Sequence, residues 1–387
     1  MTQVPNNYIY LDHNATTPVA PEVAGAMAPY ITEKFGNPSS DYPLGIEARE
    51  AVEKARGQVA NLLGTKPESI IFTSGGTESN NMVLKGMVDF RSPESTHIIT
   101  CAVEHPAVLN PLIYMMELGV KVTVLSVDRY GQVDPQDVKS TIRPDTKLIS
   151  IMLANNETGT LQPVKEICTI AHSHGVLVHS DAAQAVGKIQ VDVDELGVDF
   201  LSVAGHKLYG PKGIGALYVR EGCSLAPLIH GASQEKGLRP GTENVILAVG
   251  LGAACALCAE RLEQDGQRNR KLRDRLQDLL FNAIDGLILN GHPEDRLPNT
   301  LNVSVPGLRG SSILEGIPRV MASTGAACHE KSVKISHVLS AMGVPENVAV
   351  GALRLTVGRT NDMQQIEEAA QLLISRVKDM SHDKRPE

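Results

Sequence analysis

Short apolar segments alternate with amphipathic segments between residues 70 and 219, and this alternation constrains the fold more than any other feature of the chain. Each apolar segment is only a few residues long, which is typical of strands buried on both faces of a parallel sheet. The stretch 45–63 instead carries a helical stripe of apolar side chains that ends at Gly64. We therefore expect an α/β fold with a mostly parallel central sheet covered by helices on both faces. The expected strands are 70–72, 97–100, 120–127, 148–153, 176–179, 200–203 and 214–219.

The composition is that of a soluble globular protein and argues against two kinds of partner. Hydrophobic residues make up 42% and charged residues 21% of the 387 positions. The net charge of −8 argues against a broad nucleic-acid surface, and the 3% of aromatic residues against base stacking. The apolar stretch 245–259 is shorter than the roughly 20 residues that span a bilayer, so we expect a buried helix and no membrane insertion.

The cysteines and the amino end indicate a cytoplasmic protein. Residues 1–14 lack a basic region followed by an apolar core, so no signal peptide is expected. The six cysteines are scattered along the chain, which favours reduced thiols. Cys255 and Cys258 form a C-x-x-C pair, but they fall inside the expected buried helix and are interpreted as structural.

The chain is expected to form two domains. After Glu260 the sequence becomes strongly charged over 261–275 and then shows strands at 300–305, 320–323 and 352–357. A terminal helix is expected over 362–378, with Asn361 and Gln364 as its capping box. We assign residues 16–262 to a large domain, and residues 1–15 together with 263–387 to a smaller α+β domain.

Lys207 and Asp181 each follow an apolar strand, and together they indicate a particular chemistry. Lys207 lies in Ser202–Gly213, between glycines that let a ligand approach the backbone closely. Ligands of open α/β sheets bind beyond the carboxyl ends of the strands, where both side chains are expected. Pyridoxal phosphate (PLP) needs a lysine to bind its aldehyde and an acid to keep its pyridine nitrogen protonated. The pair therefore predicts a PLP site.

Other polar residues after strands fit the same cofactor. The glycine turn at 73–80 leads into a helix whose free amides, with the Thr77 hydroxyl, suit a phosphate. His105 can stack on a planar ring, while Asn156 and Gln184 can reach a ring oxygen.

These motifs together resemble the cysteine desulfurase and selenocysteine lyase family, PLP enzymes with the class V aminotransferase fold (fold type I). The resemblance rests on residues 73–81, 153–159, 179–184, 205–207 and 239–244, and extends from Tyr10–Pro18 to 353–359. It implies a homodimer in which Thr242 reaches the cofactor of the second subunit. One departure is Ala204, where many desulfurases have a serine that contacts the phosphate.

The resemblance implies a role for each of these positions in this chain. The residues implied in cofactor binding are Gly76, Thr77, His105, Asn156, Asp181, Gln184, Ala204, Gly205, His206, Lys207 and Thr242. The residues implied in substrate binding are Arg354, Asn156 and Asn14, and the catalytic residues are Lys207, His105 and Cys328. No metal is expected.

Cys328 lies among small residues in 321–329, which leave a thiol accessible, as a nucleophile requires. The resemblance implies that Arg354 binds the substrate carboxylate, Lys207 removes the α-proton, and the Cys328 thiolate takes the sulfur as a persulfide. The products would be L-alanine and sulfur for an acceptor protein, whose role in iron–sulfur assembly the sequence leaves open. The pattern Gly325–His329 looks more like a selenocysteine lyase, so selenium remains an alternative cargo.

Three further alternatives remain open at this point. One is another class V PLP enzyme, such as an aminotransferase or a kynureninase-like hydrolase. A second is a non-catalytic sulfur carrier, although such a protein would not need every residue of the predicted site. A third is a hydrolase that binds a metal through His172, His174, His179 and Asp181; the two-residue spacing of the first pair in a helix disfavours it.

Overall fold

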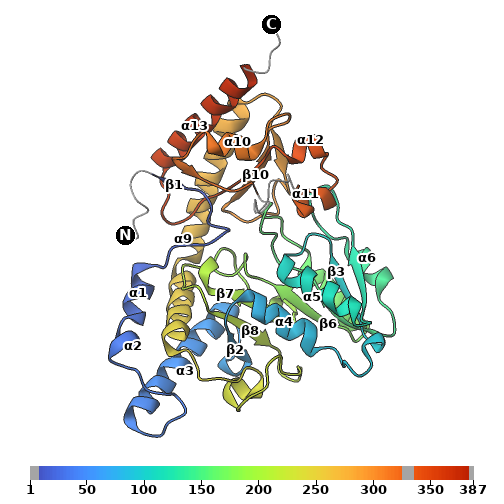
Figure 1. The fold of residues 1–387 in the computed structure, drawn as a ribbon, viewed down its shortest axis with the longest axis vertical. Helices are drawn as coiled ribbons and strands as arrows, with labels where there is room; N and C mark the ends of the chain where they lie inside the picture. Colours follow the sequence, from blue (N-terminus) through green and yellow to red (C-terminus); the bar gives the residue numbers. More distant parts are fainter. Residues whose placement is uncertain (1–7, 325–334, 383–387) are drawn as a thin grey trace.

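A seven-stranded sheet forms the centre of the larger domain in the computed structural model, which describes residues 8–324 and 335–382 (Figure 1). The strand order is β2-β8-β7-β6-β5-β3-β4, and only β8 runs antiparallel to its neighbours. The expected strands are confirmed, as is the mostly parallel sheet. The strands are β2 (Ile70–Thr73), β3 (His97–Cys101), β4 (Lys121–Leu125), β5 (Thr146–Ser150), β6 (Leu177–Asp181), β7 (Phe200–Ala204) and β8 (Gly215–Val219).

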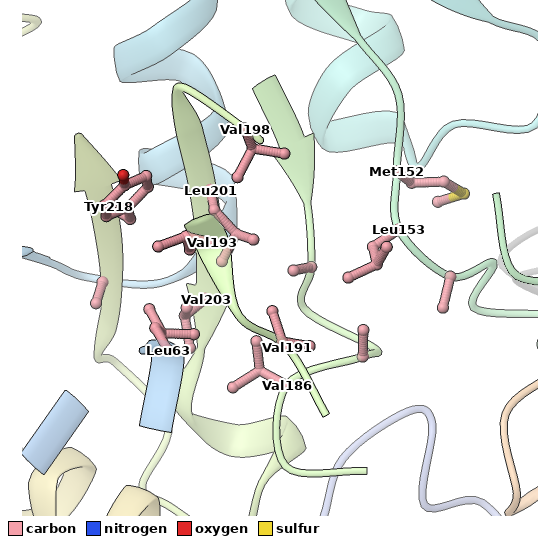
Figure 2. Packing of buried hydrophobic residues seen from close by; sticks show 14 of the residues in the cluster. Leu63, Met152, Leu153, Val186, Val191, Val193, Val198, Leu201, Val203 and Tyr218 are labelled. Carbon is pink, nitrogen blue, oxygen red and sulfur yellow. The ribbon is translucent and has the colours of Figure 1, made fainter. Parts of the chain in front are cut away.

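Helices cover both faces of this sheet, as the unbroken apolar strands predict. Consecutive strand residues point to opposite faces: Phe200 packs in the core under α4 and α5, while Leu201 packs in the core that includes α3, α7 and α9. Figure 2 shows part of the second core around Leu201 and Val203. The helices of this domain are α1 (Pro21–Met27), α2 (Pro29–Thr32), α3 (Pro43–Leu63), α4 (Gly76–Gly86), α5 (Pro106–Glu117), α6 (Pro135–Thr141), α7 (Val164–Ser173) and α8 (Val193–Leu196).

Helix α9 (Val245–Ala283) joins the two domains and is 39 residues long. Its first half is long and apolar enough to cross a membrane by length and composition alone. In this structure, however, Leu251, Cys255 and Cys258 are buried in the core of the large domain, as expected for a core helix. Its second half contributes Leu272 and Leu276 to the core of the smaller domain.

The smaller domain combines the two ends of the chain. Its three-stranded antiparallel sheet has the order β12-β10-β9, and β1 pairs in parallel with β11 beside it. This pairing brings residues 9 and 10 beside the later strands, and the division of the chain into two domains stays a prediction. The elements are β1 (Ile9–Tyr10), β9 (Ile288–Asn290), β10 (Thr300–Ser304), β11 (Val320–Met321), β12 (Ala352–Thr356), α10 (Gly310–Glu315), α11 (His337–Ala341), α12 (Glu346–Ala349) and α13 (Met363–His382).

The predicted cap of the terminal helix is wrong by one residue. Asp362, rather than Asn361, accepts the hydrogen bond from the backbone amide of Gln365 at 2.8 Å. The side chain of Asn361 instead accepts from the amide of Gly358 and donates to the carbonyl of Tyr10. Asn361 is not the cap because its side chain connects two loops through these hydrogen bonds. The local sequence does not indicate such contacts. Strand β9 was also not predicted.

Candidate active site

A cavity of about 760 Å³ opens at the carboxyl ends of the parallel strands and is closed by residues of the smaller domain. Most of the predicted site residues line it. They are Asn14, Gly76, Thr77, His105, Asn156, Asp181, Gln184, Ala204, His206, Lys207 and Arg354. The structure thus brings together side chains that lie as far apart in sequence as positions 14 and 354.

Lys207 follows β7 in a single turn of 3-10 helix, Gly205–Lys207, which directs its side chain into the cavity. Its ammonium nitrogen donates to the carbonyl of Asn14 at 2.6 Å and to that of Ala15 at 2.7 Å. Burial is the main cause that lowers the pKa of Lys207 to about 8, and the nearby guanidinium of Arg354 adds to the effect. About a tenth of this amine is therefore neutral, and so nucleophilic, at pH 7, far more than for an ordinary lysine.

Asp181 ends β6 and is fixed on both of its oxygens. Its Oδ2 accepts from Asn80 Nδ2 at 2.7 Å, and its Oδ1 accepts from the backbone amide of Ala183 at 3.0 Å. Each oxygen also keeps a lone pair for a cation in the cavity. The two hydrogen bonds fix the carboxyl group of Asp181 in a position where it can accept from a protonated ring nitrogen.

His105 is the N-cap of α5, and this role decides how its ring is protonated. Its Nδ1 accepts from the backbone amide of Ala107 at 3.0 Å. Burial lowers the pKa of His105. The ring is therefore neutral, with its proton assigned to Nε2 by the hydrogen bond on Nδ1. A neutral ring in this place suits stacking on a planar cofactor.

The amino terminus of α4 forms the anion-binding end of the cavity. Its capping residue Gly75 has φ +153° and no side chain to accept the first helical amides. A Cβ on Gly215 of β8 would lie 2.7 Å from the Gly75 Cα, so this strand can pass the turn only with a glycine there. His206 lies beside this end, with Nδ1 3.2 Å from Thr16 Oγ1, and burial lowers its pKa to about 4. Free amides and neutral donors suit a phosphate group.

Asn14 connects the walls of the cavity through all of its polar atoms. Its Nδ2 donates to the carbonyl of Asn156 and to Thr300 Oγ1, and its Oδ1 accepts from Lys188 and Asn299. Its carbonyl accepts from Gln184 as well as from Lys207. Because its side-chain atoms already form hydrogen bonds with protein groups, Asn14 holds its neighbours in position. Its predicted contact with the substrate stays a prediction.

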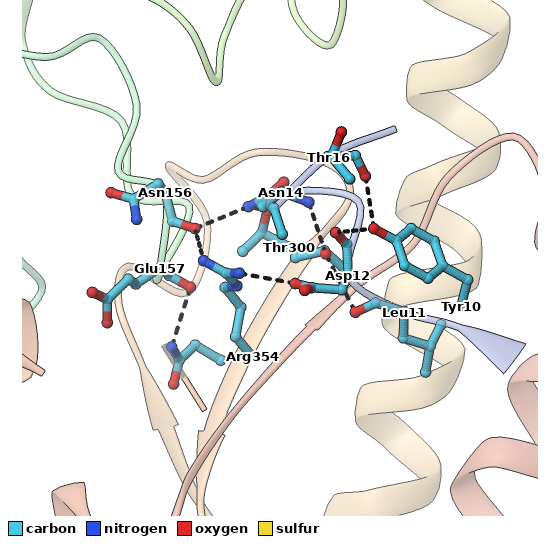
Figure 3. A network of polar contacts seen from close by, with 12 residues as sticks. Tyr10, Leu11, Asp12, Asn14, Thr16, Asn156, Glu157, Thr300 and Arg354 are labelled. Carbon is cyan, nitrogen blue, oxygen red and sulfur yellow. Dashed lines mark hydrogen bonds and ion pairs between the residues drawn. The ribbon is translucent and has the colours of Figure 1, made fainter. Parts of the chain in front are cut away.

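Arg354 extends from β12, and its side chain forms hydrogen bonds with the N-terminal segment and with the large domain (Figure 3). Its Nη2 donates to Asp12 Oδ1 at 2.8 Å, and its Nη1 donates to the carbonyl of Asn156 at 3.3 Å. The side chain is 8% exposed. A buried guanidinium in a cavity is well suited to bind a carboxylate in a fork.

Two of the sequence assignments, Gly205 and Thr242, do not line the cavity, and a third falls on a residue that the structure does not describe. Gly205 donates its amide to Ile214 and serves the turn beneath Lys207. Thr242 is exposed, so its predicted contact with a second subunit stays a prediction. Cys328 lies outside the described residues. Ile335, Ser336 and His337, the first described residues after that segment, do line the cavity.

The alternative metal site does not form. Among residues 8–324 and 335–382, no group of three or more His, Cys, Asp or Glu side chains is placed to hold a metal. His172 instead contacts Asp199 at 2.9 Å, and His179 contacts Ser150 and Ser202 inside the sheet.

Sequence reasoning missed several residues of the site. Asn80 sits in helix α4, Asp12 in the N-terminal segment, and Lys188 in a turn, so none follows a strand of the large sheet. Glu104 is fully buried beside His105, and burial raises its pKa to about 8. Only its place directly before His105 could have drawn attention to it. Glu157 lines the cavity and accepts from Ser336 Oγ at 2.5 Å.

These residues fit pyridoxal phosphate by the chemistry of their donors. A lysine amine with a lowered pKa, a carboxyl group fixed by two hydrogen bonds and a helix terminus with free amides line one cavity. The Cβ-free turn at Gly75 and Gly76 leaves room for a phosphate at that terminus. The site therefore has a partner for the aldehyde, the ring nitrogen and the phosphate of this cofactor.

Comparisons with known proteins point to the same chemistry. Residues 9–368 match the family model described as Aminotransferase class-V. Among curated proteins, a "Cysteine desulfurase IscS" of Dictyoglomus turgidum is 49% identical over 90% of this chain and 89% of its own length. The protein of the same name from Methanosarcina thermophila is 45% identical over 97% and 94% of the two chains.

Solved structures are similar over nearly the whole chain. One titled "NIFS-LIKE PROTEIN" has a TM-score of 0.89 and 38% identity, and covers 97% of this chain and 100% of its own. Another, titled "SspA in complex with cysteine", has a TM-score of 0.80 and 36% identity, with coverage of 90% and 98%.

Proposed function

The chain belongs to the class V aminotransferase family and, within it, to the cysteine desulfurases, and from this premise we propose how its own residues remove sulfur from L-cysteine. The family is PLP-dependent. In this chain the cofactor would be held by Lys207 through its aldehyde and by Asp181 through its ring nitrogen. His105 would stack on the ring, Gln184 and Asn156 would meet the ring oxygen, and Gly76, Thr77 and His206 would hold the phosphate.

One observation carries the proposal. Asp181 ends β6 and Lys207 follows the adjacent strand β7, and both face the same cavity, although 25 residues and a helix separate them in sequence. An aldehyde cofactor whose ring nitrogen must stay protonated needs that pair. When bound, the cofactor supplies an electron sink for the charge left after loss of the substrate's α-proton.

The chain's own residues then perform three tasks. Arg354 binds the substrate carboxylate and so fixes the orientation of the α-carbon. Lys207 Nζ, once released from the cofactor, takes the α-proton; its pKa of about 8 suits a base that works near neutral pH. The neutral ring of His105, with its proton on Nε2, can donate that proton within the cavity.

Cys328 completes the reaction in this proposal. Its thiolate attacks the sulfur of the bound substrate, the carbon–sulfur bond breaks, and the sulfur remains on Cys328 as a persulfide. The carbon skeleton takes a proton and leaves as L-alanine. An acceptor thiol then removes the sulfur from Cys328. Attack needs the ionised thiol, so the rate of sulfur transfer should rise with pH below the pKa of Cys328.

The assembly and the cellular setting are also proposals. We infer a homodimer in which Thr242 of one chain contacts the phosphate bound to the other, because Thr242 is exposed at the end of its loop. A sulfur-acceptor protein and a cytoplasmic location follow from the proposed persulfide chemistry, which needs reduced thiols. No role for nucleic acid or membrane is proposed.

The decisive experiment replaces Lys207. Purified Lys207→Ala should lack the visible absorbance of the bound cofactor and form no alanine from L-cysteine. The matched control is Lys147→Ala, an exposed lysine on β5, which should keep both. Persistent yellow colour in Lys207→Ala would refute the assignment. A Cys328→Ala variant should keep the colour but lose sulfide production; full activity would refute the persulfide role.

The cargo needs a separate measurement. The curated relatives named above are cysteine desulfurases, whereas Gly325–His329, outside the described residues, resembles selenocysteine lyases. We propose sulfur as the main cargo. Turnover of L-cysteine and L-selenocysteine by the same preparation should favour cysteine under physiological concentrations. Activity confined to selenocysteine would overturn this choice.

A further inference from the structure

Asp12 is the ion-pair partner of Arg354, which lines the cavity (Figure 3). Its backbone lies beside β12, where it forms an isolated parallel bridge with Thr356. The hydroxyl of Tyr10 donates to the Asp12 carbonyl at 3.0 Å, which fixes the same peptide from the other side. The carboxylate of Asp12 is therefore anchored by the N-terminal segment rather than free to follow the arginine.

The contacts of Arg354 leave part of its guanidinium available. Asp12 accepts from Nη2 and the Asn156 carbonyl accepts from Nη1, while Nε is buried without a partner within the described part of the chain. A guanidinium has five N–H donors, so the two recorded bonds leave three. A ligand carboxylate can therefore bind without displacing Asp12.

A second carboxylate competes for the same guanidinium. Glu157 lines the cavity; burial raises the pKa of its carboxyl group, and the positive charge of Arg354 acts in the opposite direction. Its own carboxylate is occupied by Ser336 Oγ at 2.5 Å. If Asp12 lost its charge, an uncharged side chain at position 12 and the Asn156 carbonyl at 3.3 Å would oppose the attraction of Arg354 toward Glu157 less strongly. The guanidinium would then be drawn away from the orientation that Asp12 imposes.

We propose that Asp12 is a positioning residue that holds Arg354 in the orientation that binds the carboxylate of an amino-acid substrate. This inference rests on the proposed function, because it assumes that Arg354 binds that carboxylate. It assigns the N-terminal segment a part in substrate recognition, although Asp12 lies 342 positions from Arg354 in sequence.

The test is Asp12→Asn, which keeps the shape of the side chain and removes its charge. We expect the KM for L-cysteine to rise about tenfold with kcat little changed, as for the loss of one charged hydrogen bond to the binding group. L-cysteine methyl ester has no free carboxylate, and its KM should not change. The dissociation constant of L-alanine, read from the visible spectrum of the holoenzyme without turnover, should rise by the same factor.

The matched control is Asp265→Asn. Asp265 pairs with Arg359 at 2.6 Å with 15% and 13% exposure, close to the Asp12 pair, but Arg359, unlike Arg354, does not line the cavity. It should alter the melting temperature without changing either KM. If Asp12→Asn does not fold, Asp12→Glu keeps the charge but moves it by one methylene, and should give a smaller rise in the KM for L-cysteine.

The outcomes separate the inference from the function on which it rests. An unchanged or lower KM for L-cysteine in Asp12→Asn would overturn the positioning role, and so would an equal rise for the methyl ester. Arg354→Gln should raise the KM for L-cysteine in any case. If Arg354→Gln raises the KM for L-cysteine and Asp12→Asn does not, only the positioning role of Asp12 is refuted. If neither variant changes this KM, the proposed role of Arg354 is refuted as well.

Discussion

Asp181 and Arg354 line the same cavity, but they are held there in different ways. Asp181 ends a strand of the large sheet, and its partners Asn80 and Ala183 belong to the same domain. Arg354 comes from the smaller domain, and its partners Asp12 and Asn156 come from the N-terminal segment and the large domain. The sheet therefore provides one wall of the site by local geometry, whereas the other wall exists only when distant segments meet.

This difference predicts how each wall of the cavity should respond to a substitution. A change on the sheet wall removes a chemical group from a framework that remains in place. A change on the wall formed by Asn14, Asp12 and Arg354 also loosens the contact between domains. The variants below separate loss of chemistry from loss of positioning.

The largest effect is expected on the sheet wall, from Asp181→Asn. The amide cannot stabilise a protonated ring nitrogen, so kcat should fall about a thousandfold, the usual scale for losing one preorganised electrostatic partner. The measurement is alanine formation from L-cysteine. The control is Asp199→Asn, a buried carboxylate next to β7 that pairs with His172 outside the cavity. It should lower stability but keep kcat; equal losses in both variants would mean that the effect is structural.

The next effect is expected on the opposite wall, from Asn14→Ala. Its removal leaves Asn299 Nδ2 and Lys188 Nζ each without one of their acceptors. We expect a loss of about 3 kcal/mol in the free energy of unfolding, since each buried polar group left unpaired costs about 1–3 kcal/mol. Denaturant unfolding measures this. A loss below about 1 kcal/mol would show that the two walls are held independently of Asn14.

The pH dependence of PLP uptake tests whether Arg354 on one wall lowers the pKa of Lys207 on the other. Only the neutral amine of Lys207 captures an aldehyde, so the rate of PLP uptake by cofactor-free protein should rise with pH and level off above about pH 8. The charge of Arg354 helps to lower the pKa of Lys207. In Arg354→Gln that pKa should rise, and the plateau should move to higher pH. Uptake followed at 25 °C across the pH range would show this, and coincident profiles would contradict it.

The smallest effect is expected away from both walls, from Cys255→Ala. Cys255 is fully buried in α9, and burial raises its pKa well above the ordinary value, so it has no thiolate to carry sulfur. Losing one buried sulfur should cost about 1 kcal/mol of stability, measured by denaturant unfolding. Sulfide release from L-cysteine should not change. A loss of release at normal stability would place this thiol on the path of the sulfur.

The same contrast explains how much of the molecule the sequence predicts. The strands and the residues that follow them, such as His105, Asp181 and Lys207, are predictable because a buried parallel strand has an unmistakable apolar pattern and its carboxyl end faces the site. Asn80 escapes notice because a polar residue in a helix is most often exposed.

The other wall depends on contacts that no local pattern encodes. Asp12 and Arg354 are 342 positions apart, and nothing near either residue indicates the pair. Lys188 reads as an ordinary surface lysine in a turn, yet it donates to Gln184 and Asn14. The terminal cap was misplaced for a similar reason, because Asn361 is engaged by Tyr10 from the opposite end of the chain. Resemblance to a family can identify Arg354 as a site residue, but its partners Asp12 and Asn156 are evident only from the structure.

The pairing of β1 with β11 has a consequence for synthesis of the chain on the ribosome. Ile9 emerges well before its partner Val320, which follows some 300 residues later. At about 5–20 residues per second, the N-terminal strand waits roughly 15 to 60 s for its partner. During that interval the large domain can fold, while Ile9 and Leu11, both fully buried in the finished protein, stay exposed to solvent. The nascent chain therefore exposes an unpaired apolar segment at Ile9 and Leu11 until Val320 has been translated.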